Sequence, residues 1–447
     1  DKILDRARQE KMTPVELADK YIKNYFVDFD GLNVKRATEY PKASEHIPDM
    51  QNLISDLIAK GYAYKKKDGV YLSVRSLSGR VKKTGKRLTK YGNLKGVKNI
   101  EELVSAAMRM KKKRLTELKK KYKGKPMTDS DDAELKDDQA ELDELNKKTK
   151  LEGKRKKDIL DFALWKVGKF DRSWHSPWGD GRPGWHIECS AMGLKYLGEN
   201  FEIHGGGRDL IFPHHENEIA QSESNTSKQF AKIWMHVGMI TINGEKMSKS
   251  IGNVKTVNHV LGNWGPNIIR LFCLSGGYRK PIDYSEKLLR ENVTKLRQIE
   301  SCYFELWLAE DAGDVTVGKK LVEECKEEFD SALNDDLNTP DALKTYYKLI
   351  REVDKLAADE KITQTSAELI LPEFERMSKI LGIQIPKVSD TEKNEINQIV
   401  KKRDEYRMQK NYEQADNIRN ELVEKNIFFV DHKKKTTWVK QEIINAE

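Results

Sequence analysis

Apolar residues recur with helical spacing along most of the second half of the chain. They repeat every three to four positions, which places them on one face of an α-helix and predicts amphipathic helices that pack together. The stretches with this pattern are 257–274, 286–308, 322–357 and 365–381. Pro281 separates the first two stretches, and Pro386 follows the last. We therefore expect this half to be mostly α-helical, with a helical bundle from residue 322 onward.

A different arrangement follows Pro386. Residues 395–410 and 412–425 have the pattern of two helices joined by a tight turn. Residues 427–430 and 436–439 are short runs of β-branched and aromatic residues. This order predicts a helical hairpin followed by a small β-ribbon.

The first half of the chain mixes helical and strand patterns. Thr13, Pro14 and Glu16 combine an N-cap, a first-turn proline and a capping glutamate, which predicts a helix that begins there. A second helix is predicted over residues 48–60, and the alternation over residues 62–74 predicts a hairpin.

Further along, the apolar run 201–203 predicts a buried strand, and residues 233–242 predict a second strand in a parallel sheet. Gly205–Gly207 predicts a turn where the backbone approaches another group closely, and Pro213 predicts the start of a helix. The first half is therefore expected to be α/β.

Composition limits the class of protein. A chain of 447 residues is too long for one core, and two to four domains are expected. The formal charge of +9, with 34% charged residues, suits a polyanionic partner but is also common among highly charged proteins. The cysteines lack disulfide-like spacing and no secretory signal precedes them, which predicts a reducing, cytoplasmic compartment. No apolar run is long enough to span a membrane.

The segment Lys246–Asn253, KMSKSIGN, places two lysines and two serines in a loop next to glycine. Lysine is a flexible point charge, and charge stabilisation is the main task of a protein in phosphoryl chemistry. The loop therefore predicts a nucleotide phosphate site. An ordinary solvated loop is the alternative, because short motifs need structural context.

Cys189, His214 and Glu218 are candidate metal ligands. His214 and Glu218 are four residues apart, so a helix would place them on one face, and a thiolate from Cys189 would complete most of a tetrahedral zinc set. The alternative is that His214 caps the helix, Glu218 is a surface carboxylate and Cys189 only packs.

The blocks that carry these residues resemble the cysteinyl-tRNA synthetases, a family of class I aminoacyl-tRNA synthetases. The blocks are GRPGWHIECSAM, FEIHGGGRDLIFPHHENEIAQSE and GEKMSKSIGN. Shorter matches are residues 1–7, 36–39, 335–340 and 436–438. The resemblance covers nearly the whole chain apart from about residues 80–157. It implies a Rossmann-like nucleotide-binding domain, here incomplete, followed by a mostly α-helical carboxy-terminal half.

The resemblance also implies roles for single residues. The zinc ligands of the family fall on Cys189, His214 and Glu218, and Trp185 and His204 would line the pocket for cysteine. Lys246 and Lys249 would neutralise charge on the ATP phosphates, and Lys249 would contact ATP. Asp209 would hold the adenosine ribose. The positions that read the tRNA anticodon are Arg407, Tyr412 and Asp416. At Tyr412 the family usually has tryptophan.

The implied reaction is ATP-dependent ligation of L-cysteine to tRNA(Cys) through a cysteinyl-adenylate, with Mg²⁺ accompanying ATP and Zn²⁺ selecting the thiol. A zinc–sulfur bond rejects serine, so no editing domain is expected. A monomer is expected, and the sequence leaves the oligomeric state open. Two alternatives are a ligase that joins cysteine to an amino sugar and a non-catalytic tRNA-binding paralogue.

One departure concerns the beginning of the family pattern. The family opens with a fourth zinc ligand, a cysteine, and a His-x-Gly-His segment that grips the ATP phosphates, and neither is present in this sequence. We expect a truncation, and we expect this chain to be inactive by itself.

Charge is strongly segregated in the stretch outside the resemblance. Between residues 109 and 125, ten lysines and arginines accompany one acidic residue, Glu117. Between residues 129 and 144, nine acidic residues accompany one lysine, Lys136. Such runs predict solvated helices or disorder, and the alternative is a basic arm on tRNA phosphates.

The resemblance, together with these patterns, implies an order of domains. Residues 1–79 hold the end of the first catalytic half and a connective region, and residues 80–157 are the charged insertion. The other expected domains are the second catalytic half with the zinc site and the KMSKS loop (158–256), a stem-contact region (257–310), a helical bundle (311–386) and an anticodon-binding tail (387–447).

Overall fold

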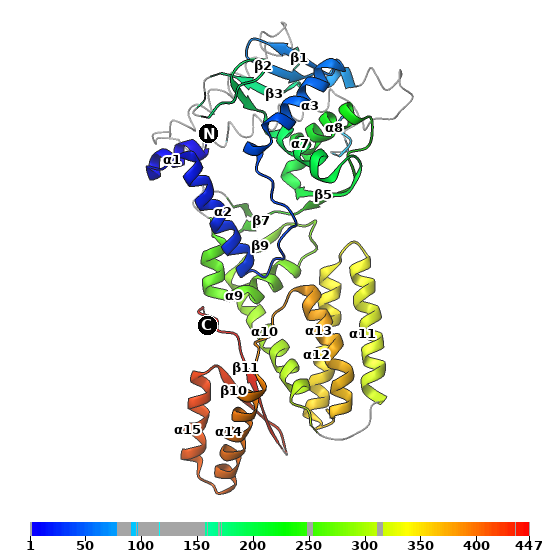
Figure 1. Cartoon of the computed structure of the whole chain (residues 1–447). Helices are drawn as coiled ribbons and strands as arrows, with labels where there is room; N and C mark the ends of the chain where they lie inside the picture. The colour runs from blue at the N-terminus through cyan, green and yellow to red at the C-terminus, as the bar shows by residue number, and fades with distance from the viewer. Residues whose placement is uncertain are drawn as a thin grey trace. The chain divides into compact units, whose positions relative to one another are not determined.

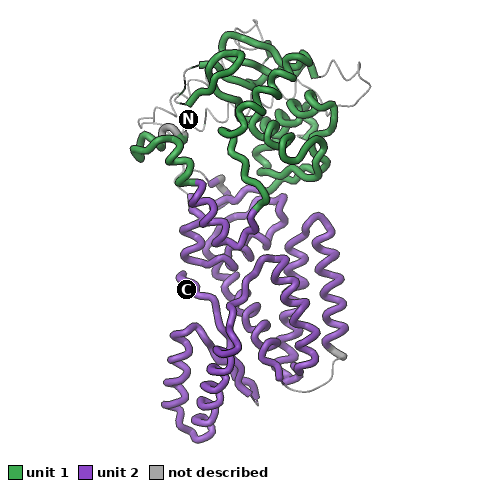
Figure 2. Tube along the Cα trace, viewed as in Figure 1, with its two compact units in different colours: residues 1–21, 37–237 green, residues 22–36, 238–447 purple. Residues whose placement is uncertain are grey.

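The computed structural model describes residues 2–77, 91–94, 96, 116, 157–158, 160–168, 170, 172–247, 254–310, 316–433 and 435–446. Lys249 and nearly all of the charged insertion therefore lie outside the described residues. The chain divides into two compact units (Figure 2). The first unit comprises residues 1–21 and 37–237, and the second comprises residues 22–36 and 238–447.

Helices α1 (Lys2–Glu10) and α2 (Pro14–Gly31) begin the chain (Figure 1). The predicted N-cap of α2 is confirmed, because Glu16 N–H donates to Thr13 Oγ1 and Thr13 N–H donates to Glu16 Oε2. Helix α1 was not predicted.

An antiparallel sheet forms the core of the first unit. It has the order β1 (Ala63–Lys66), β2 (Gly69–Leu72), β3 (Phe162–Val167) and β4 (Gly181–Pro183). The predicted hairpin is β1–β2, with Lys66 opposite Gly69. A short 3-10 turn, η1 (Ala43–Glu45), leads into the predicted second helix, which is α3 (Ile47–Ala59). Met50, Leu57, Leu164 and Trp165 are fully buried in this core.

The remainder of the first unit is an α/β segment. Its elements are α7 (Trp185–Leu197), β5 (Phe201–Gly207), η2 (Arg208–Leu210), η3 (Ile211–His215), α8 (Glu216–Thr226) and β6 (Ala231–Val237). Helix α7 packs on α8, and both pack on α3. Strands β5 and β6 pair in parallel, as predicted, with Phe201 opposite Ala231 and Gly207 opposite Val237.

Two predictions about β5 are wrong. Ile203 is 56% exposed, and so is its partner Ile233 at 58%, so the strand is not buried along its length. Gly205–Gly207 continue the strand instead of forming a turn. The predicted close approach is present nevertheless, because a Cβ on Gly206 would lie 2.6 Å from Cε1 of His215.

The helix predicted from Pro213 begins later, at Glu216. Phe212 is extended, with φ −137° and ψ 130°, and Pro213 lies in the wide turn η3 that precedes α8. A proline has no N–H to donate, so it fits this turn as well as it fits a first helical turn. The predicted strand 233–242 is two strands, because Gly238 separates β6 from β7 (Ile240–Ile242). A Cβ on Gly238 would lie 2.0 Å from the Lys280 carbonyl oxygen, so only glycine fits there.

The second unit contains a small mixed sheet in the order β8 (Glu245–Lys246), β7 and β9 (Ile282–Tyr284). The helices that follow are α9 (Val257–Leu274), α10 (Glu286–Trp307), α11 (Thr316–Asn334), α12 (Thr339–Ala358) and α13 (Gln364–Leu381). They share one apolar core in which Phe329, Tyr346 and Phe374 are fully buried.

The predicted stretch 322–357 is two helices. Asp336 and Leu337 both have φ of 54°, and the Asn338 side chain accepts from Asp341 N–H to cap α12. The predicted helical hairpin and β-ribbon are confirmed as α14 (Asp390–Met408), α15 (Tyr412–Glu424), β10 (Ile427–Asp431) and β11 (Thr436–Lys440). An α/β first half and a mostly helical second half therefore agree with the expected fold class. No helix among the described residues is long and apolar enough to cross a membrane.

Candidate metal centre and substrate site

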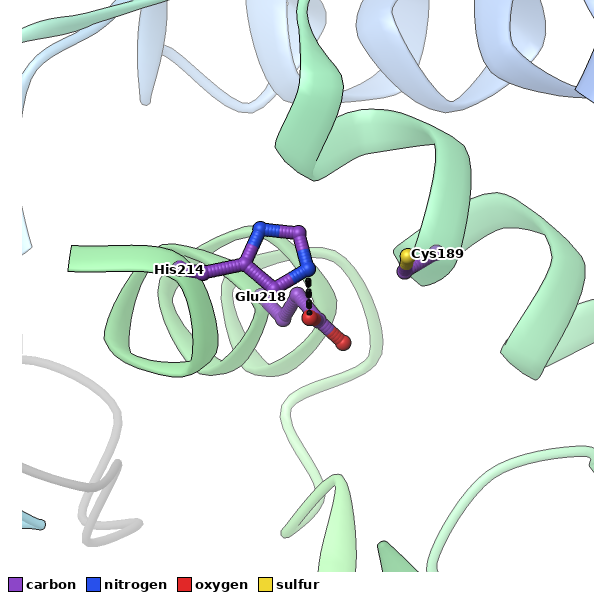
Figure 3. A group of neighbouring side chains, drawn as sticks. All are labelled: Cys189, His214 and Glu218. Atoms are coloured by element: carbon purple, nitrogen blue, oxygen red, sulfur yellow. Dashed lines mark ion pairs between the residues drawn. The ribbon is translucent and has the colours of Figure 1, made fainter. Parts of the chain in front are cut away.

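Helices α7 and α8 bring the predicted metal ligands together. Cys189 lies in α7, His214 in η3 and Glu218 in α8, and their ligand atoms all lie within 4.8 Å of one another (Figure 3). The spacing of His214 and Glu218 places His214 Nε2 2.8 Å from Glu218 Oε1. Convergence of the three residues, which the sequence spacing only suggested, is thus a property of the fold.

The alternative readings of Glu218 and His214 are wrong, and a ligand role for Cys189 stays a prediction. Glu218 is 0% exposed, so it is no surface carboxylate. His214 makes no side-chain cap to α8. Cys189 is partly exposed and lies beside ligand atoms of the other two residues.

Glu218 is the electrostatic centre of the site. Its Oε2 lies 2.7 Å from His204 Nε2, and its Oε1 faces His214. Burial would raise the pKa of this carboxyl group, but the contacts with His204 and His214 outweigh burial and lower its pKa to about 2. Glu218 is therefore an anion at neutral pH, as a metal ligand must be.

The donor set fits zinc. Thiolate, imidazole and carboxylate are the ligand types that Zn²⁺ takes in proteins. Glu218 Oε1 has no hydrogen-bond donor aligned with it, although the atom is buried, so it is suited to coordinate a cation. Burial, and then the charges of Glu218 and Glu188, raises the pKa of the Cys189 thiol to about 12. A metal bound there would have to displace the thiol proton.

A cluster of histidines surrounds the three ligands, and most of it was missed in the sequence. His186 Nδ1 lies 2.7 Å from His214 Nδ1, and His215 Nδ1 lies 2.8 Å from His236 Nε2. Burial lowers the pKa of His186 and of His215 to about 4 each. A signal was available, because five of the nine histidines fall between residues 186 and 236.

Aromatic rings cover two sides of the site. Trp185, which is 58% exposed, stacks on His214 with ring centroids 4.2 Å apart and an angle of 25°. His204 stacks on Trp234 at 4.4 Å and 16°. Trp185 and His204 are the residues predicted to line the cysteine pocket. Trp185 contacts His214, and His204 contacts Glu218.

Of the remaining predicted residues of the catalytic half, Asp209 and Lys246 are described by the structure and Lys249 is not. Asp209 is exposed in η2, directly after β5. Lys246 ends β8 and pairs with Thr241 of β7 in the second unit. The turn before it is held by Asp283, which accepts hydrogen bonds from Thr241 Oγ1 and Gly244 N–H.

The predicted anticodon residues divide into two kinds. Arg407 is tied to the ribbon, because its Nη1 donates to Asp431 Oδ1 at 2.8 Å. Tyr412 is 60% exposed at the start of α15, and Asp416 is exposed one turn later. Tyr412 and Asp416 therefore offer an aromatic face and a carboxylate from the same side of one helix.

Comparison with known proteins identifies the family. The family model of the class I (C) tRNA synthetase catalytic domain matches residues 1–130 and 95–294, and that of the DALR domain matches residues 328–385, within the helical bundle. The cysteine--tRNA ligase of Caldicellulosiruptor saccharolyticus is 41% identical over 431 residues, covering 94% of this chain and 81% of that protein. The cysteine--tRNA ligase of Thermodesulfovibrio yellowstonii is 38% identical, covering 98% of this chain and 85% of that protein.

The fold has a counterpart among solved structures. Methionyl-tRNA synthetase of Mycobacterium tuberculosis, in complex with methionyl-adenylate, superimposes with a TM-score of 0.51 at 14% identity, covering 85% of this chain and 79% of that one. At this identity the likeness shows the class I synthetase fold alone. The identity to curated relatives over nearly the whole chain shows more, and the chain belongs to the cysteine--tRNA ligase family.

Proposed function

We propose that this protein joins L-cysteine to tRNA(Cys) at the expense of ATP. The observation that carries the proposal is the convergence of Cys189, His214 and Glu218 within 4.8 Å, in a chain of this family. The tail formed by α14, α15, β10 and β11 supports tRNA, and not an amino sugar, as the acceptor of cysteine.

Cys189, His214 and Glu218 would hold a zinc ion. Bound there, zinc supplies a soft Lewis acid that bonds the thiolate of cysteine far better than the hydroxyl of serine. A substrate that lacks the contact for which a site is built is rejected by a factor on the order of 10⁴, whereas the shape of an apolar pocket rejects a similar substrate by a factor of about 10². Trp185 and His204, which contact His214 and Glu218, would form the walls that orient the side chain of the substrate.

Activation of cysteine consumes ATP in a displacement at phosphorus. The carboxylate of cysteine attacks the α-phosphorus, the bond to the β-phosphate oxygen breaks, and pyrophosphate leaves. Lys246 and Lys249 would neutralise the charge that develops on the departing phosphates, with Mg²⁺ bound to ATP. Asp209, exposed after β5, would hold the adenosine ribose through its carboxylate.

Transfer to tRNA follows from the same intermediate. A ribose hydroxyl of the terminal nucleotide attacks the carbonyl carbon of the cysteinyl-adenylate, and AMP leaves with the bonding electrons. The tail would select the correct tRNA, with Tyr412 stacking on an unpaired base and Asp416 accepting from a base-edge donor. Arg407, held by Asp431, would contact the adjacent RNA backbone.

The domain order fits these roles. Residues 158–256 would carry the zinc site and the KMSKS loop, residues 257–310 would contact the tRNA stem, and residues 387–447 would read the anticodon. Residues 80–157 would be an insertion, although Tyr91 and Gly92 within it bond to Asn217 and Glu216 of α8.

Charging assays test the proposal. The purified protein, produced with the cysteine and the His-x-Gly-His segment that open the family pattern, should attach cysteine to tRNA(Cys) in the presence of ATP and Mg²⁺. Serine should be charged at least about 10⁴-fold less efficiently. Removal of zinc with a chelator should abolish this preference, and added zinc should restore it. Equal charging with serine, or no cysteine-dependent charging, would contradict the proposed function.

A further inference from the structure

His214 contacts another histidine at the ring nitrogen that points away from Glu218. Its Nδ1 lies 2.7 Å from Nδ1 of His186, while its Nε2 lies 2.8 Å from Glu218 Oε1. Two ring nitrogens at this separation share one proton, so one of them donates and the other accepts. The position of the proton on His214 therefore depends on two neighbours, His186 at Nδ1 and Glu218 at Nε2.

The two possible tautomers of His214 differ in what they offer to a metal. With its proton on Nε2, His214 presents an N–H to the side of Glu218 and has no lone pair directed at the ligand cluster. With its proton on Nδ1, it donates to His186 and leaves the Nε2 lone pair directed at Glu218 and Cys189. A neighbour that accepts from Nδ1 stabilises the second tautomer, as partners of metal-bound histidines generally do.

The first turn of α7 is built to hold that neighbour. Trp185 and His186 are its first two residues, and Cys189 follows one turn later on the same side of the helix. Trp185 stacks on the face of His214 while His186 meets its edge. The His186 ring itself packs edge-on against Phe162 of β3, with centroids 5.7 Å apart and an angle of 85°.

We propose that His186 is a positioning residue for the metal site, accepting the Nδ1 proton of His214 so that His214 Nε2 is free to bind zinc. The inference rests on the proposed function, in which Cys189, His214 and Glu218 hold the ion. The first turns of α7 then supply three parts of the site. Cys189 is a ligand, His186 fixes the tautomer of His214, and the ring of Trp185 covers His214.

Two substitutions of the same shape test the hydrogen bond separately from packing. In H186N the amide oxygen can occupy the position of Nδ1 and accept from His214, whereas H186L puts a methyl group there. We expect H186L to raise the Kd for zinc by about 10–100-fold in chelator competition, and H186N to stay within a few-fold of the wild type. With cobalt in place of zinc, the thiolate charge-transfer band should persist in H186N and change in H186L.

A matched control is H46L. His46 is buried in the same unit, and its Nδ1 lies 2.8 Å from the Lys42 carbonyl oxygen, outside the histidine cluster. H46L should keep wild-type zinc affinity even if the melting temperature falls. Wild-type zinc affinity in H186L, or equal loss of affinity in H186L and H186N when both are folded, would overturn the role of His186. A wild-type protein that takes no zinc would overturn the metal site itself.

Discussion

Glu218 shows how a single buried side chain can set the chemistry of a site. Two imidazoles face its oxygens, and these contacts keep it ionised despite complete burial. An isolated carboxylate in such a place would take up a proton, because burial disfavours charge. The anionic state at neutral pH thus depends on His204 and His214 and prepares the site for a cation.

Cys189 should be required for zinc binding. We expect about one zinc per chain in the wild type and less than about a tenth of that in Cys189→Ala, because removal of the thiolate leaves only two ligands. Metal analysis of the purified proteins measures this. Cys273→Ala is the control, since that cysteine lies in α9. Equal zinc contents in wild type and Cys189→Ala would show that the site is assigned wrongly.

Lys249 should act on the chemical step and not on tRNA. If its charge stabilises the departing pyrophosphate, Lys249→Ala should lower cysteine-dependent exchange of pyrophosphate into ATP by about 10²-fold or more. Binding of tRNA should hardly change. Lys255→Ala is a control at an exposed lysine just beyond the loop. Equal exchange rates in Lys249→Ala and wild type would exclude the role.

At the scale of elements, the segment after β11 returns to the helices of the second unit. Glu442 N–H donates to Glu300 Oε1 at 2.7 Å, and the Glu442 side chain accepts from Asn267 of α9. Arg297 donates both to Glu300 and to the Glu442 carbonyl oxygen. Residues 441–446 therefore connect the tail to α9 and α10 through a largely buried polar network.

This network predicts a pH dependence of stability. Burial raises the pKa of Glu300 to about 7 from an ordinary 4.5, and Glu442 N–H and Arg297 compensate only in part. Because the folded pKa lies above the unfolded one, protonated Glu300 favours the folded state below about pH 4.5. This contribution disappears as the pH rises through about 7.

Glu300→Gln should flatten that dependence. The amide oxygen can still accept from Glu442 N–H, and the group no longer ionises. We expect the stability difference between pH 5 and pH 8 to shrink by about 1–3 kcal/mol, measured as melting temperature and urea midpoint across that range. Glu291→Gln, at an exposed position of the same helix, should leave it unchanged. Identical pH profiles in Glu300→Gln and wild type would contradict the prediction.

At the scale of the whole molecule, two segments are candidates for contact with tRNA by different physics. If the basic run 109–125 binds phosphates, neutralising it should weaken binding of all tRNAs alike. The slope of the salt dependence should decrease by about one unit for each phosphate group that the protein no longer neutralises. Binding measured across salt concentrations tests this. An unchanged slope would make the run a solvated surface.

The tail should act selectively instead. A base-reading pair contributes about 1–3 kcal/mol of discrimination, so Asp416→Ala or Tyr412→Ala should reduce charging of tRNA(Cys) while barely altering the salt slope. Both side chains are exposed, so neither substitution should lower the melting temperature much. Normal charging by the Asp416 variant would leave the tail as a packing element.

Sequence patterns were most accurate where the determinants of structure are local. The starts of α2 and α15 and the strands of the tail ribbon match the prediction closely, because caps, prolines and apolar spacing act within a few residues. The break between α11 and α12 was missed in the apolar pattern, although Asn338 caps the second helix there. The metal-ligand roles of Cys189, His214 and Glu218 came from the family resemblance and stay a prediction.

Burial was decided only by tertiary structure. Helix α8 is polar in sequence, yet residues 216–224 are all buried, because α7 and α3 pack on it. Tyr91, Gly92 and Phe230 come from elsewhere in the chain to donate hydrogen bonds to its buried side chains. Ile203 shows the converse, since an apolar run cannot reveal which side of a strand is covered. Exposure depends on partners distant in sequence, which periodicity does not contain.

The sequence by itself determined the kinds of side chain available to the site and the helices that carry them. Only the tertiary structure brought α7, η3 and α8 close enough for His186 to meet His214 and for Glu218 to face two imidazoles. Burial and the contacts with His204 and His214 determine the pKa of Glu218. These effects act over a few ångströms in space, whatever the separation of the residues along the chain.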